Sequence, residues 1–240
     1  MIGDGRDADT APLAKTLLKH ARVTHVFAPN YRLSIVPEGR FPAAFQDAVT
    51  AYHYLISTLS IPASRITFSG DSAGGNLSLT LHRYIVEYGA ELGLPEPAAN
   101  LLWSPWIDID AARDPQNLLE SPNYFTDYLS SNFTTWGARL FAPLGKGFNT
   151  ADPYVSPLGS PFKAKSPFWI HTGDAEVLYF DDVKLAEELK GVGNKVEIVV
   201  DHGVPHDILL VGHMLGFTEE AAVAAKKAGE FLRANRFAGQ

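Results

Sequence analysis

The chain has 240 residues, of which 46% are hydrophobic and 20% are charged, a composition typical of a globular protein. Its 20 lysines and arginines against 27 aspartates and glutamates give a net charge of −7, and no basic run offers a track for phosphates, so we expect no nucleic-acid partner. The absence of cysteine excludes disulfides, a thiolate nucleophile and cysteine-based zinc sites. The acidic amino end lacks the features of a secretory signal, and no window reaches the roughly 18 apolar residues of a membrane span, so we expect no membrane-spanning segment.

Apolar spacing predicts helices and strands that alternate along most of the chain. Such alternation is typical of an α/β fold with a mostly parallel sheet flanked by helices, and the length favours one domain over residues 1–240. The predicted elements are a helix over 13–21, a strand over 23–29, a helix over 44–59, a strand over 66–69, a helix over 77–85, strands over 98–103 and 168–172, a helix over 182–189, a strand over 196–200 and a helix over 218–237.

The alternation stops between about residues 107 and 166, where proline, serine, asparagine and aromatic residues dominate. Long plain loops are rare in compact domains, so we predict a lid-like insertion that faces the substrate. Its aromatic side chains favour contacts with a hydrophobic group, although such residues are equally often plain core.

The segment Gly70-Asp71-Ser72-Ala73-Gly74 fits the pattern G-x-S-x-G. An apolar strand is predicted before it and a helix rich in alanine and leucine after it, which is the setting of a nucleophile elbow. In such a turn the serine hydroxyl is exposed and small neighbours let strand and helix approach. The context therefore indicates a nucleophilic serine rather than a plain turn.

A serine nucleophile needs a base, and the base needs an acid that orients it. The last two predicted strands are followed by candidates for both: Asp174 and Glu176 come after one, and His202 and His206 after the other. Sites of open α/β sheets lie at these carboxyl ends. Glycine and proline between the two histidines disfavour a helical zinc pair. Spacing alone does not choose between the two acids or between the two histidines.

Several further segments follow a known pattern: Asn30-Tyr31-Arg32-Leu33-Ser34, Phe41-Pro42-Ala43-Ala44-Phe45-Gln46-Asp47-Ala48, Gly70-Asp71-Ser72-Ala73-Gly74-Gly75-Asn76-Leu77, Leu102-Trp103-Ser104-Pro105-Trp106, and the neighbourhoods of Glu176 and His206. With these segments the chain resembles the hormone-sensitive-lipase-like branch of the α/β-hydrolases, and most nearly its filamentous-fungal esterases. The acid of that family opens a D/E-x-L segment soon after a Thr-Ala/Gly pair, and its histidine ends a Gly-x-x-His stretch. The resemblance therefore selects Glu176 over Asp174 and His206 over His202.

The resemblance implies that Ser72 attacks an ester carbonyl, His206 takes and returns the proton, and Glu176 orients His206. It implies a small hydrophobic ester as substrate and neither metal nor organic cofactor. Related enzymes carry a His-Gly-Gly-Gly turn that supplies most of the oxyanion hole, and this sequence has none. The N–H of Ala73 is then the one oxyanion donor that can be predicted.

The missing turn leads to three expectations. We expect that the chain begins just after this turn and lacks the strand that precedes it, which leaves a gap between the segment ending near Pro29 and the strand ending near Ser69. We favour a mis-called start or a fragment of a longer chain over a degenerate relative and over strands that close the gap by pairing anew. Because losing one oxyanion donor costs about 10²–10³ in turnover, this form is a weak or inactive esterase. The alternative is a ligand-binding protein on the same scaffold, as in plant hormone receptors of similar sequence; these have lost the catalytic histidine, which is retained here.

Overall fold

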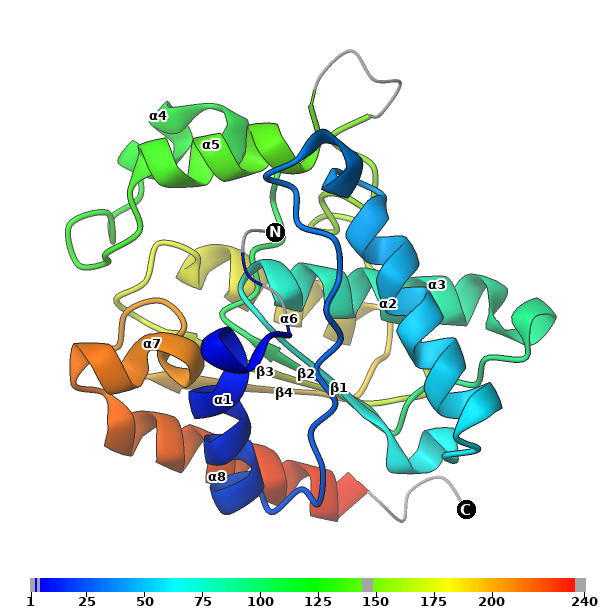
Figure 1. Cartoon of the computed structure of the whole chain (residues 1–240). Coiled ribbons are helices and arrows are strands. Elements are labelled where there is room, and N and C mark those ends of the chain that lie inside the picture. Colours follow the sequence, from blue (N-terminus) through cyan, green and yellow to red (C-terminus); the bar gives the residue numbers. More distant parts are fainter. Residues whose placement is uncertain (1–2, 4, 144–148, 236–240) are drawn as a thin grey trace.

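The computed structural model describes residue 3, residues 5–143 and residues 149–235. Its centre is a four-stranded parallel sheet in the order β1-β2-β3-β4, which confirms the predicted α/β class (Figure 1). The strands are β1 (Thr67–Asp71), β2 (Ala99–Trp103), β3 (Phe168–Gly173) and β4 (Val196–Asp201). All four lie where the apolar runs predicted them, within two residues at each end.

Helices cover both faces of the sheet. On one face, α3 (Ala73–Leu92) and α6 (Tyr179–Gly191) pack on side chains such as Leu102 and Ile170. On the other face, α8 (Thr218–Asn235) packs on Trp103 and Trp169. The inner strands β2 and β3 are therefore buried on both sides, which explains why most of their residues are apolar. The remaining helices are α1 (Asp7–Thr16), α2 (Ala43–His53), α4 (Pro115–Leu119), α5 (Ser131–Phe141) and α7 (Ile208–Leu215).

The strand predicted over residues 23–29 is wrong, because this segment is irregular. A strand requires a neighbour about 4.8 Å away, and a cavity lined by residues 23–29 and by β1 separates the two. Within the part of the chain that the structure describes, β1 is therefore an edge strand. Since Ser72 N–H donates to Trp103 O and backbone groups alternate in direction along a strand, the N–H and C=O groups of Thr67, Ser69 and Asp71 point to the unpaired edge.

The helices differ from the predictions at one start, and one helix was missed. The first helix begins at Asp7 and not after Pro12, which lies inside α1. Helix α7 was not predicted, since its sequence, ILLVGHML, has no polar face to mark a helical period. Helix α8 is described as far as Asn235, and the last two residues of the helix predicted over 218–237 lie outside the described residues.

The segment predicted as a lid-like insertion joins β2 to β3 and contains α4 and α5, which lie beyond the carboxyl ends of the strands (Figure 1). Residues 144–148 of this segment lie outside the described residues. Of the helices that the structure describes, none combines the length and apolar character required to cross a membrane.

Candidate active site

Ser72 is the single residue between the end of β1 and the start of α3, and its backbone is strained, with φ of 49° and ψ of −118°. Its neighbours must be small because the chain crosses itself closely here. A Cβ added to Gly70 would lie 2.1 Å from the carbonyl oxygen of Gly74, and one added to Gly75 would lie 2.8 Å from Cβ of Pro105. The G-x-S-x-G sequence therefore builds a sharp strand-to-helix turn that presents the serine hydroxyl.

The structure brings the three predicted residues together at the carboxyl edge of the sheet. Nε2 of His206 lies 2.9 Å from Oγ of Ser72, although the two residues are 134 positions apart in the sequence. Nδ1 of His206 lies 3.4 Å from Oε2 of Glu176. His206 and Glu176 are 2% and 0% exposed, so both side chains of this contact are shielded from water. Hydroxyl, imidazole and carboxylate thus form a continuous chain.

The alternative residues are placed elsewhere. Nδ1 of His202 lies 2.6 Å from Oδ2 of Asp174, and the side chain of His202 is 98% exposed. The N–H of Gly203 also donates to the Asp174 carboxylate, which fixes this pair to the loop surface. Asp174 and His202 therefore pair with each other, while Glu176 and His206 pair next to the serine.

A second buried carboxyl group supports Glu176. Burial opposes ionisation of Glu176, but attraction to His206 and contacts with Asp182 and Thr172 outweigh it and hold the pKa of Glu176 below its usual value. Burial, followed by the adjacent charge of Glu176, raises the pKa of Asp182 well above the usual range. A protonated Asp182 beside an ionised Glu176 is consistent with both directions. Asp182 was not predicted from the sequence, although an acidic residue at helical spacing with the buried Leu185, Ala186 and Leu189 is a signal that could have revealed it.

A second pair of interacting carboxyl groups, Asp71 and Asp207, lies next to Ser72 and His206 in the sequence. Burial raises the pKa of Asp71, next to Ser72, and raises the pKa of Asp207, next to His206, well above the usual range. The two carboxyl groups interact with each other. Asp207 also has a left-handed backbone, with φ of 53°, and its N–H donates to Oγ of Ser104 at 3.1 Å. These contacts fix the backbone on both sides of the Ser72–His206 contact.

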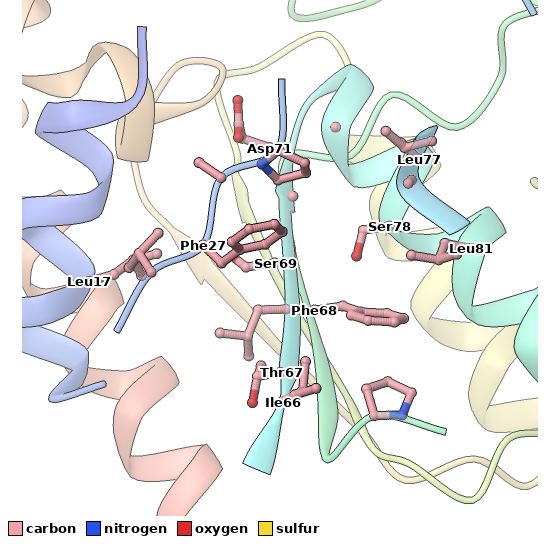
Figure 2. A pocket seen from close by; sticks show the side chains of 18 of the residues that line it. Leu17, Phe27, Ile66, Thr67, Phe68, Ser69, Asp71, Leu77, Ser78 and Leu81 are labelled. Atoms are coloured by element: carbon pink, nitrogen blue, oxygen red, sulfur yellow. The ribbon is translucent and has the colours of Figure 1, made fainter. Parts of the chain in front are cut away.

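Ser72 and His206 open onto a cavity of about 1920 Å³. This exceeds the roughly 300–1,000 Å³ typical of small-molecule sites, because the space beside Ser72 continues along the unpaired edge of β1. Figure 2 shows Leu17 and Phe27 on one side of β1, and Leu77 and Leu81 of α3 on the other. The wall that residues 106–137 contribute to this cavity consists of Trp106, Tyr128, Leu129, Phe133, Thr134, Trp136 and Gly137.

The predicted oxyanion donor, Ala73, is the first residue of α3. Amides of a first helical turn have no partner within the helix and attract negative charge, so this N–H is suited to a developing oxyanion beside Ser72. Over the described ranges, no cluster of three or more histidine, aspartate or glutamate side chains is arranged to hold a metal ion.

Residues 5–210 match a family model described as an alpha/beta hydrolase fold. The chain is similar to an ethyl acetate hydrolase of Pseudomonas putida, with 29% identity over 85% of this chain and 62% of that protein. It is also similar to a versiconal hemiacetal acetate esterase of Emericella nidulans, with 40% identity over 80% of this chain and 65% of that protein. Among solved structures, an esterase from the bacterial hormone-sensitive lipase family superposes with a TM-score of 0.80 and 28% identity, covering 98% of this chain and 75% of that one. The chain thus spans less than two thirds of the length of either curated relative.

Proposed function

Because the chain belongs to the α/β-hydrolase fold family, in its hormone-sensitive-lipase-like branch, we propose that it is a serine hydrolase of carboxylic esters. The observation that carries the proposal is the 2.9 Å contact between His206 Nε2 and Ser72 Oγ in a half-buried, strained turn. The names of two relatives, an ethyl acetate hydrolase and a hemiacetal acetate esterase, favour acetate esters as substrates.

In the proposed reaction, Oγ of Ser72 attacks the ester carbonyl carbon while Nε2 of His206 takes the hydroxyl proton. The carbonyl oxygen becomes negative and the Ala73 N–H stabilises it. Collapse of this intermediate breaks the ester bond, and His206 passes its proton to the departing alcohol. Water then attacks the acyl-serine while His206 takes one of its protons, and collapse of this second intermediate breaks the bond between the acyl carbon and Oγ. His206 returns the proton to Oγ of Ser72 as the carboxylic acid leaves. Glu176 orients the imidazole and stabilises its cation throughout.

The same residues set the expected level of activity. The sequence has no His-Gly-Gly-Gly turn, so the N–H of Ala73 is the one oxyanion donor identified. Each missing donor costs about 10²–10³ in turnover. We therefore expect weak hydrolysis by the 240-residue chain. The same deficit, together with the large cavity, supports non-catalytic ligand binding as the second candidate.

Hydrolysis of p-nitrophenyl acetate tests the proposal with a matched pair of histidine variants. Ser72→Ala and His206→Ala are expected to reduce turnover to background. His202→Ala removes an exposed histidine four positions from His206 and is expected to leave turnover unchanged. Turnover that survives Ser72→Ala and His206→Ala would contradict the proposed mechanism. A folded wild-type chain that binds the ester but does not hydrolyse it would favour the binding protein.

A further inference from the structure

A short segment of the insertion, residues 123–128, binds directly to the loop that carries the acid. Nδ2 of Asn123 donates to the carbonyl oxygens of Asp174 and Glu176 at 2.9 and 2.8 Å. Oγ1 of Thr126 donates to the carbonyl oxygen of Ala175 at 2.8 Å. Three consecutive carbonyl groups around Glu176 thus accept hydrogen bonds from side chains of this segment, which we call the strap.

The strap also reaches the loop that carries the histidine, through Asp127. Oδ2 of Asp127 accepts the N–H of Val177 at 2.9 Å, one residue after the acid. Oδ1 accepts the N–H of His206 at 3.3 Å and that of Tyr128 at 2.7 Å. One carboxylate therefore joins the backbone beside Glu176 to the backbone of His206.

Other contacts between these two loops lie at some distance from the reacting side chains. The N–H of Ala175 donates to Val204 O at 3.3 Å, and the N–H of Gly203 donates to the Asp174 carboxylate at 2.6 Å. Neither contact involves the residue next to the acid on its carboxyl side or the histidine itself. Asp127 is the described side chain that holds both of those positions at once.

We propose that Asp127 is a positioning residue for the catalytic acid and histidine, so that the insertion controls the geometry of the site as well as covering it. The inference rests on the proposed ester hydrolysis. Its chemical basis is the number of acceptors: an ionised carboxylate has two oxygens that accept N–H groups on different loops. An asparagine has one acceptor oxygen, so it can serve the His206 loop or the Val177 N–H but not both.

Asp127→Ala and Asp127→Asn test the inference, with Asp114→Ala as the control. Asp114 lies in the same insertion, and within the described residues its carboxylate accepts the local N–H of Gln116 alone. For p-nitrophenyl acetate, Asp127→Ala is expected to lower kcat by about 10- to 100-fold with KM nearly unchanged, because small misplacements of catalytic groups cost this much. Asp127→Asn is expected to fall between Asp127→Ala and wild type, while Asp114→Ala keeps the wild-type kcat.

Amide hydrogen exchange provides a readout that needs no turnover. The amides of Val177 and His206 are expected to exchange about 10-fold faster in Asp127→Ala, with one of the two amides retaining its protection in Asp127→Asn. Unchanged exchange at both amides would overturn the inference, and so would faster exchange with unchanged kcat. If the wild-type chain proves inactive, the proposed function fails, and the exchange rates alone still decide whether Asp127 holds the two loops. Should Asp127→Ala not fold, Asp127→Asn carries the same comparison.

Discussion

Replacing Asp182 by asparagine should change how the stability of the protein depends on pH. Asp182 is 0% exposed, and burial beside the charged Glu176 raises its pKa well above the usual range. Between the ordinary carboxyl pKa near 4 and this raised value, Asp182 is protonated in the folded protein and ionised in the unfolded chain. Folding then binds one proton more than the unfolded state holds. The stability that protonated Asp182 contributes is complete below the pKa of the unfolded chain and is lost as pH rises through the raised pKa of the folded protein.

The size of the effect follows from proton linkage. One such group lowers the free energy of unfolding by about 1.4 kcal/mol for each pH unit across this window. An asparagine amide is neutral at every pH, so Asp182→Asn removes this contribution to the slope while still offering an N–H to Glu176. The stability of the variant relative to wild type should therefore rise by about 1.4 kcal/mol for one unit of pH.

Urea unfolding of both proteins in a series of buffers from about pH 4 upward measures this difference across the window, whose upper limit is the raised pKa of Asp182. Glu187→Gln is the control, because Glu187 is an exposed carboxyl group on the same helix, α6, and should keep the wild-type slope. Equal slopes for wild type and Asp182→Asn would refute the reasoning, because they would mean that Asp182 is ionised in the folded protein.

Three other substitutions address the scaffold of the site. Asn76→Ala removes Nδ2, which donates to two backbone carbonyl oxygens at 3.0 Å each. The free energy of unfolding measured in urea should fall by roughly 2–4 kcal/mol. A much smaller loss would mean that the carbonyl groups find other donors. Gly173→Ala places a Cβ 1.9 Å from Val204 O, between the acid and histidine loops, and should lower ester turnover by about 100-fold. In the control Gly191→Ala the added Cβ meets nothing within 4 Å, so turnover should match wild type. Equal turnover in both variants would contradict this expectation. A hydrogen bond with the buried His171 lowers the pKa of Asp201 to about 2, so the stability that the ionised Asp201 contributes is lost as pH falls from about 4 to about 2. Asp201→Asn should therefore flatten the acid unfolding curve in this range, as followed by tryptophan fluorescence. An unchanged curve would contradict the assignment.

The sheet could be predicted from the sequence because its strands coincide with short, mainly apolar runs, of which the inner two, β2 and β3, become buried on both faces. The segment over 23–29 has the same apolar character but is not a strand. Apolar composition shows that a segment can pair, whereas a strand forms only where a neighbour is present, and the space next to β1 is a cavity. This is information about tertiary structure that no local pattern contains.

The positions of the candidate site residues were predictable to different degrees. Ser72 follows from a motif with a mechanical cause, since only small residues fit around its turn. Spacing left two acids and two histidines open, and resemblance favoured the pair that the structure places next to the serine. Asp127 was not predicted at all, because its contacts join an irregular segment to two loops that lie 50 and 79 positions away in the sequence.

The role of Ser72 is tested by covalent labelling of the folded chain with a fluorophosphonate probe, with the labelled residue mapped by peptide mass spectrometry. One adduct is expected on Ser72, and it should be lost in His206→Ala and retained in His202→Ala. An adduct on another residue, or no adduct on a folded chain, would contradict the central claim that Ser72 is a nucleophile activated by His206.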